Sequence, residues 1–107
     1  MREFAVPASV QIAPDANLTD AVFANAARHG EDVAFVRKVS GPWRPVTARE
    51  FATDVGQVAA GLMASGVEPG DRVALLSRTR YGWTVVDFAI WTAGGVTVPV
   101  YETSSAE

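Results

Sequence analysis

Hydrophobic and polar residues alternate with different periods along the chain, and the first clear period is helical. In residues 17–30, apolar side chains recur every four positions from Leu18, which predicts a short amphipathic helix. Asn17 or Thr19 can cap its start, and Gly30 suits a left-handed stop at its end. We therefore expect the first helix to end at Gly30.

An extended pattern follows this helix. Residues 33–39 are rich in β-branched side chains, residues 40–42 read Ser-Gly-Pro, and residues 43–46 resume an extended pattern. Two such runs separated by a turn signal are typical of a β-hairpin.

A second helix is expected from Thr47. Thr47 and Glu50 have the spacing of a capping box, in which each side chain satisfies a backbone N–H of the other residue. Apolar positions then recur with helical spacing at Phe51, Val55, Val58, Ala59 and Leu62. Gly66 is expected to end this helix.

The last third of the chain predicts a strand, a helix and a second strand. Residues 72–77 have a continuously apolar centre, which is typical of a strand covered on both faces. Residues 81–93 are apolar on nearly every side and predict a buried helix that stops at Gly94 and Gly95, and residues 96–100 predict another strand. A βαβ unit of this length has parallel strands, so the expected fold class is α/β.

The domain organisation follows from these elements. Residues 1–16 carry Pro7 and Pro14 without a clear period, so we expect an extended N-terminal arm. Residues 17–107 are expected to be the start of a larger domain, because a doubly wound sheet normally continues after its second parallel strand. The chain is therefore interpreted as an incomplete domain.

Composition excludes several classes of protein. Hydrophobic residues make up 49% of the 107 residues, the net charge is −3, and there are no cysteines. A disulfide framework and thiolate metal sites are thus excluded, and scattered basic residues argue against a nucleic-acid partner. No stretch has the length of a transmembrane segment or the pattern of a signal peptide, so cytoplasmic residence is expected.

Two polar segments are candidates for a ligand site. Residues 77–80 (Ser-Arg-Thr-Arg) and 101–104 (Tyr-Glu-Thr-Ser) each follow a predicted parallel strand, where open α/β sheets bind ligands. The first segment lacks the repeated glycines of a phosphate loop. We interpret it as a capped helix start with solvated Arg78 and Arg80, and the second segment as a polar loop.

Other chemistry-bearing residues have structural interpretations. His29 is expected at a helix end, where the dipole favours a cation, and Trp83 and Trp91 are expected in the core rather than on a cofactor surface with Trp43. Gly94 and Gly95 follow a helix, which is the wrong order for a dinucleotide fingerprint. No catalytic, cofactor-binding or metal-binding residue is assigned in this chain.

Several motifs together resemble one enzyme family. "PGDRVAL" (residues 69–75), "SRTRYGW" (77–83) and "AGGVTVPVYETSS" (93–105) occur in an order similar to that of AMP-forming long-chain fatty acid–CoA ligases. The "NLTD" and "VTAREF" segments fit the same pattern, so the resemblance covers the chain from Leu18 onward. Gly82 departs from it, since glutamate often stands there in the family.

The resemblance implies a two-step reaction for the whole enzyme. A fatty carboxylate attacks ATP, with Mg²⁺ assisting, to give an acyl-adenylate and pyrophosphate, and CoA then displaces AMP. The family's phosphate loop, nucleotide-binding motifs and C-terminal lysine all lie beyond position 107. Because adenylyl transfer depends on positioned cations, residues 1–107 alone are expected to be inactive and to serve as a scaffold for the remainder of the ligase. The whole enzyme could be peripheral to a membrane.

Two other interpretations stay open from the residues themselves. The chain could be a small self-contained nucleotide-binding module, with the ligand near Arg78 and Tyr101 at the strand ends. It could also be an interaction module, because two parallel strands without neighbours leave open edges that invite self-association.

Overall fold

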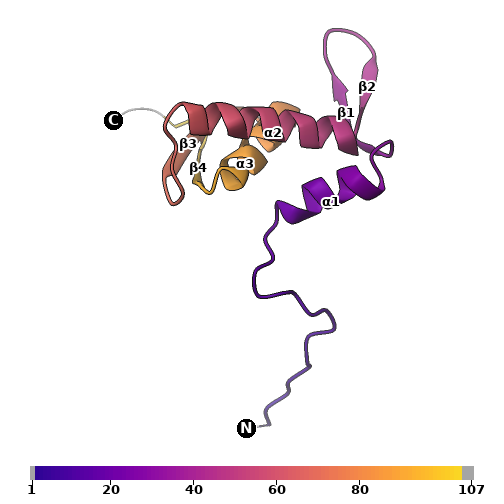
Figure 1. The fold of residues 1–107 in the computed structure, drawn as a ribbon, viewed down its shortest axis with the longest axis vertical. Helices are drawn as coiled ribbons and strands as arrows, with labels where there is room; N and C mark the ends of the chain where they lie inside the picture. Colours follow the sequence, from indigo (N-terminus) through magenta and orange to yellow (C-terminus); the bar gives the residue numbers. More distant parts are fainter. Residues whose placement is uncertain (1, 105–107) are drawn as a thin grey trace.

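The computed structural model describes residues 2–104 of the chain and confirms the α/β class. The elements in chain order are α1 (Asp20–Arg28), β1 (Val33–Lys38), β2 (Trp43–Thr47), α2 (Ala48–Ala64), β3 (Arg72–Leu76), α3 (Tyr81–Thr92) and β4 (Val96–Val100). Each predicted helix and strand is present, in the predicted order. Figure 1 shows α2 across the middle of the molecule, with the hairpin at one end and the β3–β4 pair at the other.

The hairpin consists of β1 and β2, which pair antiparallel with Val36 opposite Pro45. Its register shifts between Val33 and Phe35, which marks a bulge or irregularity near the start of β1. The turn contains Ser40 and Gly41, which both have a positive φ. The hairpin projects from the body in Figure 1. Of its ten paired residues, Val46 alone is buried.

Helix α2 begins at the predicted capping box. The Thr47 hydroxyl accepts a hydrogen bond from the Glu50 backbone N–H at 3.2 Å, and the Glu50 carboxylate accepts one from the Thr47 N–H at 2.7 Å. Two of the N–H groups at the helix start are thereby satisfied. The helix ends at Ala64, and Gly66 follows it with a φ of +97°.

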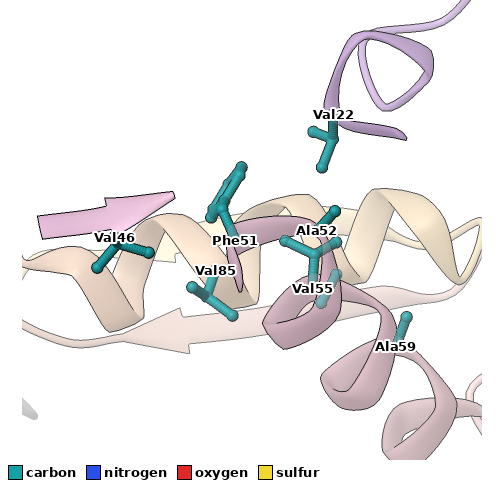
Figure 2. Close-up of a cluster of buried hydrophobic side chains, with 8 residues drawn as sticks. Val22, Val46, Phe51, Ala52, Val55, Ala59 and Val85 are labelled. Atoms are coloured by element: carbon teal, nitrogen blue, oxygen red, sulfur yellow. The ribbon is translucent and has the colours of Figure 1, made fainter. Parts of the chain in front are cut away.

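The core is built around one face of α2. Val55 and Ala59 are 0% and 1% exposed, and they pack with side chains from α1, the hairpin and α3 (Figure 2). Phe51 of α2 lies 4.8 Å from the Phe35 ring of β1 and 5.7 Å from the Phe88 ring of α3, in tilted and edge-on arrangements. Aromatic pairs in such arrangements add to the stabilisation from burial.

The βαβ unit is parallel, as expected, with Arg72 opposite Val96 and Leu76 opposite Val100. Helix α3 packs between α2 and this pair of strands, and Ile90 is fully buried there. The expectation that the first strand is covered on both faces is wrong for residues 2–104. Leu75 is buried beneath α3, whereas Ala74 and Leu76 on the opposite face are exposed.

The end of α1 differs from the prediction in its physical cause. Gly30 does not have a positive φ, and the cap residue is His29 in a non-helical conformation. A Cβ on Gly30 would lie 2.6 Å from the Ala26 carbonyl oxygen and 2.6 Å from Arg49 Nη2. Close packing, rather than a left-handed turn, therefore requires glycine here.

The starts of α1 and α3 are capped differently. The Asn17 side chain accepts hydrogen bonds from the backbone N–H groups of Thr19 and Asp20, so Asn17 supplies the cap of α1. At α3 the N-cap residue is Arg80, which makes no side-chain capping bond, and the first turn contains no acidic residue. The predicted capped start of this helix is therefore wrong.

No helix among the described residues is long and apolar enough to cross a membrane.

The packing of α3 predicts a large effect of truncating its buried side chain. Ile90→Ala should lower the free energy of unfolding by about 2–5 kcal/mol, because it removes buried methyl groups and leaves a cavity. Thermal and urea denaturation followed by circular dichroism measure the change. Met63→Ala on the exposed side of α2 is the control and should shift stability by no more than about 0.5 kcal/mol. Equal effects of the two variants would contradict the packing described.

The uncapped start of α3 predicts a stabilising substitution. Gly82→Glu should raise the free energy of unfolding by roughly 1 kcal/mol, since glutamate has a better helix propensity and its charge complements the helix dipole. A Cβ at Gly82 meets no atom closer than Arg80 Nε at 4.0 Å, so the side chain fits. Gly82→Gln separates propensity from charge and should give a smaller, salt-independent gain. A loss of stability in both variants would contradict this account.

Candidate functional site

The carboxyl ends of β3 and β4 form a crevice that brings together the two predicted polar segments. The cavity is about 290 Å³ and is lined by Ser77, Arg78, Thr79, Trp83, Pro99, Val100, Tyr101 and Glu102. Parallel pairing accounts for this arrangement, because it places both strand ends at the same edge of the sheet. Ligands in open α/β sheets bind at such edges.

An ion pair connects the two sides of this crevice. Arg78 Nε lies 3.1 Å from Glu102 Oε2, and both side chains are largely exposed. A solvent-exposed pair of this kind contributes little to stability. The ion pair directs the Arg78 guanidinium toward the segment that follows β4. The Arg78 cation at this edge of the sheet therefore already has an anionic partner.

The crevice does not assemble catalytic machinery from the described residues. Among residues 2–104 no group of three or more His, Asp or Glu side chains could hold a metal ion. Ser77 Oγ donates a hydrogen bond to the Arg78 carbonyl at 3.2 Å. The absence of an assigned catalytic residue stays a prediction.

A larger groove lies between the hairpin and the helices. Its volume is about 800 Å³, and its lining combines hairpin residues such as Phe35 and Trp43 with Asp54 of α2 and Tyr81 of α3. The Tyr81 hydroxyl donates a hydrogen bond of 2.7 Å to Asp54 Oδ2, and the Arg37 guanidinium lies 4.7 Å from the centre of the Tyr81 ring. These contacts join three separate elements through one phenol ring.

The environment of Tyr81 favours its neutral form. Burial, followed by the hydrogen bond to Asp54 and the negative charge of that carboxylate, raises the pKa of the Tyr81 phenol well above its usual value of about 10. The Arg37 cation acts in the opposite direction and does not reverse the shift.

Sequence reasoning placed other candidate residues with mixed success. His29 is at the end of α1, as expected, but Asp32 lies 3.6 Å from its Nδ1, a partner that the sequence reading did not identify. Trp91 is half-buried against Phe88, whereas Trp83 is half-buried at the crevice and Trp43 is exposed on the hairpin. Neither Trp83 nor Trp91 belongs to the buried core, so the core interpretation of these two residues is wrong for the described part of the chain.

Two buried polar groups were missed by the sequence analysis. Asp87 of α3 is 8% exposed, and its Oδ1 has no hydrogen-bond partner within residues 2–104. The Oγ1 of Thr97 in β4 is also buried and unpartnered there. An aspartate within an otherwise apolar helix was the available signal, since buried carboxylates normally have partners.

The Tyr81–Asp54 hydrogen bond predicts a pH-dependent stability. Tyr81→Phe should lower the free energy of unfolding by about 1 kcal/mol at neutral pH. Because the pKa of Tyr81 is higher in the folded state, its contribution is fully present below pH about 10 and is lost as pH rises through the folded pKa. Denaturation from pH 7 to 11 should show the two proteins converging above pH about 10. Tyr101→Phe, at an exposed position, is the control and should not reproduce this behaviour.

Comparison with known proteins identifies close relatives. The chain is 44% identical over all 107 residues to the long-chain-fatty-acid–CoA ligase FadD15 of Mycobacterium tuberculosis and spans 18% of that protein. Among solved structures, the fatty acid AMP ligase of Legionella pneumophila is similar, with a TM-score of 0.75 and 25% sequence identity. The match covers 83% of this chain and 16% of the Legionella protein. A putative long-chain-fatty-acid CoA ligase of Rhodopseudomonas palustris is also similar, with a TM-score of 0.74 and 30% identity. The match covers 86% of this chain and 22% of the Rhodopseudomonas protein.

These relatives agree with the fold and with the resemblance seen in the sequence. The chain spans less than a fifth of the curated relatives that it matches over its whole length. The model of the AMP-binding enzyme family matches residues 22–107, which include all of the α2 core and the βαβ unit. On this evidence the chain belongs to the AMP-binding enzyme family.

Proposed function

We propose that residues 17–107 form the start of the adenylate-forming domain of a long-chain fatty acid–CoA ligase, and that residues 1–16 are an arm preceding it. The observation that supports this most strongly is 44% identity along the whole chain to a ligase of that specificity. The family match begins at residue 22, within α1, which fits a domain that starts near residue 17.

The reaction proposed for the whole enzyme joins a fatty acid to CoA at the expense of ATP, with Mg²⁺ assisting. Residues 2–104 supply structural support for that reaction. The α2 core holds α3, and α3 in turn positions β3 and β4, whose carboxyl ends face the same side. Sites for ATP, Mg²⁺ and CoA are proposed to lie in the remainder of the ligase. That remainder is the main proposed partner of this chain.

A separate nucleotide-binding module is not supported. The relatives that match the whole chain are ligases several times longer than it, and the crevice offers one arginine that is already paired with Glu102. We further propose that the ligase is cytoplasmic and can lie at a membrane surface.

Self-association of the 107-residue chain is proposed on a separate observation. The outer face of the β3–β4 pair exposes Leu76, Val96 and Val98, which are 64%, 51% and 40% accessible. Contiguous apolar residues at an open sheet often mark a contact surface.

A chimeric ligase tests the proposed function. This chain would replace the matching 107-residue stretch of the FadD15 relative, and palmitate-dependent ATP–pyrophosphate exchange and palmitoyl-CoA formation would be measured. We expect the chimera to be active within about tenfold of the parent, because only a shared scaffold has changed. The isolated chain should show no exchange.

The matched control carries Val55→Asp in the chimera. An unpaired charge at this fully buried position should disrupt the core and abolish activity. An inactive chimera that is folded by circular dichroism, or robust exchange by the isolated chain, would overturn the proposal.

A further inference from the structure

The β1–β2 hairpin gathers basic side chains that are separated in the sequence. Arg37 and Lys38 lie in β1, and the antiparallel register places Arg44 of β2 opposite Arg37 and Trp43 opposite Lys38. No aspartate or glutamate occurs in residues 33–49, whereas the whole chain has a net charge of −3. The hairpin is therefore a local positive region on a chain that is negatively charged overall.

The three cations of the hairpin form no ion pair within residues 2–104. Glu50 and Asp54 border a cavity at the base of the hairpin together with Arg37 and Arg44. Each of these carboxylates already accepts a hydrogen bond from another residue. The positive charge of the hairpin is thus only partly offset by its neighbours.

Apolar side chains are exposed on the same hairpin. Every residue from 36 to 45, which we call the hairpin tip, is exposed, and Val36, Val39 and Trp43 are 61%, 54% and 66% accessible. Figure 1 shows the tip projecting from the body at the end of α2 that lies away from β3 and β4. Its apolar surface is separate from the open face of those strands, which is typical of a segment of a larger sheet.

The tip is fixed to the body of the molecule at its base. The Phe35 ring lies 4.8 Å from the Phe51 ring and 5.5 Å from the Tyr81 ring. Two residues further along β1, the Arg37 guanidinium lies 4.7 Å from the centre of the Tyr81 ring. Because the tip is ordered before binding, little conformational entropy is lost when it contacts a partner.

Cations beside exposed apolar side chains match the surface of an anionic membrane. Each Lys or Arg close to such a surface strengthens binding by about fivefold, and tryptophan favours the boundary between headgroups and acyl chains. A single-stranded nucleic acid would also attract the cations, but it binds by stacking its bases on several aromatic rings. Trp43 is the one aromatic residue of the tip, and two valines accompany it. Lipid is therefore the better match.

We propose that the hairpin tip binds the headgroup region of an anionic membrane. Trp43 and Val39 insert among the headgroups, and Lys38 and Arg44 lie beside lipid phosphates. This inference rests on the proposed membrane-surface location of the ligase and names the surface that carries it.

Cosedimentation of the 107-residue chain with lipid vesicles tests the inference. The vesicles contain phosphatidylcholine alone or with about 30 mol% phosphatidylglycerol, which supplies anionic headgroups. The chain should bind the anionic vesicles at least about tenfold more tightly than the neutral ones, and salt should weaken binding by screening the cations. Equal binding to both vesicles, or binding to neither, would overturn the proposal.

Tryptophan fluorescence reports on the tip directly. Emission should shift to shorter wavelength when the chain binds anionic vesicles, because Trp43 leaves water. Trp43→Phe should remove this shift while binding persists, since phenylalanine keeps an aromatic ring at the same position. A shift that survives in Trp43→Phe would show that another tryptophan enters the lipid and would contradict the proposal.

Substitutions at exposed positions compare the tip with the rest of the surface. Lys38→Ala and Trp43→Ala should each weaken binding to the anionic vesicles by about fivefold. Arg72→Ala removes a cation from β3, and Phe4→Ala removes an exposed aromatic ring from the N-terminal arm; both controls should leave binding within about twofold. Binding that depends on the control residues and not on the tip would place the membrane contact elsewhere.

The chimeric ligase shows whether the tip stays accessible in a whole enzyme. It should bind anionic vesicles with the same dependence on Lys38 and Trp43, and the tip variants should keep exchange activity in vesicle-free solution within about twofold. An active chimera whose vesicle binding does not depend on the tip would overturn this inference alone. An inactive chimera that binds through the tip would overturn the proposed function alone.

A nucleic-acid partner is the remaining outcome. Binding of the 107-residue chain to a single-stranded oligonucleotide, lost in Lys38→Ala and Trp43→Ala, together with no binding to anionic vesicles, would assign the tip to nucleic acid and overturn the membrane proposal.

Discussion

The buried face of α2 is the contact on which the rest of this chain depends. Val55 and Ala59 allow α1, the hairpin and α3 to approach one helix from different sides, and these two side chains are almost completely buried by the contacts. The small volume of Ala59 matters as much as the apolar character of Val55, because close-packed interiors tolerate little change in volume. The β3–β4 strands have no comparable contact with α2 and are held chiefly through α3.

Because β3 and β4 are held chiefly through α3, the structure is well packed around α2 and open at the β3–β4 strands. Helix α3 uses one side for α2 and the other for the strands, and Ile90 is buried on it. Beyond the strands, Leu76, Val96 and Val98 face outward without cover among residues 2–104. A continuously apolar strand with one exposed face is what a segment of a larger sheet looks like, and the ligases that resemble this chain are several times longer.

The crevice and the groove contribute differently to function. The crevice lies where α/β enzymes bind ligands, but its Arg78 is paired with Glu102, and residues 2–104 contain no cluster that could hold a metal ion. The groove is organised by Tyr81, whose hydroxyl and ring contact Asp54 and Arg37. These polar contacts connect the hairpin, α2 and α3, so their role is to hold elements together. In this family the chemistry itself is proposed to reside in the remaining domain.

The sequence by itself determined the elements, their order and the family. Periodicity, the Thr47–Glu50 capping box and the motif order are local signals, and local hydrogen bonding and side-chain spacing act on them before any tertiary contact forms. Only the tertiary structure decided which groups meet across the chain. The reason for Gly30 is the nearby Ala26 carbonyl and Arg49 side chain, and the partner of Tyr81 is Asp54, 27 residues away. The burial of Asp87 is likewise a property of the packed structure. Such long-range contacts depend on packing geometry, which no periodic pattern encodes.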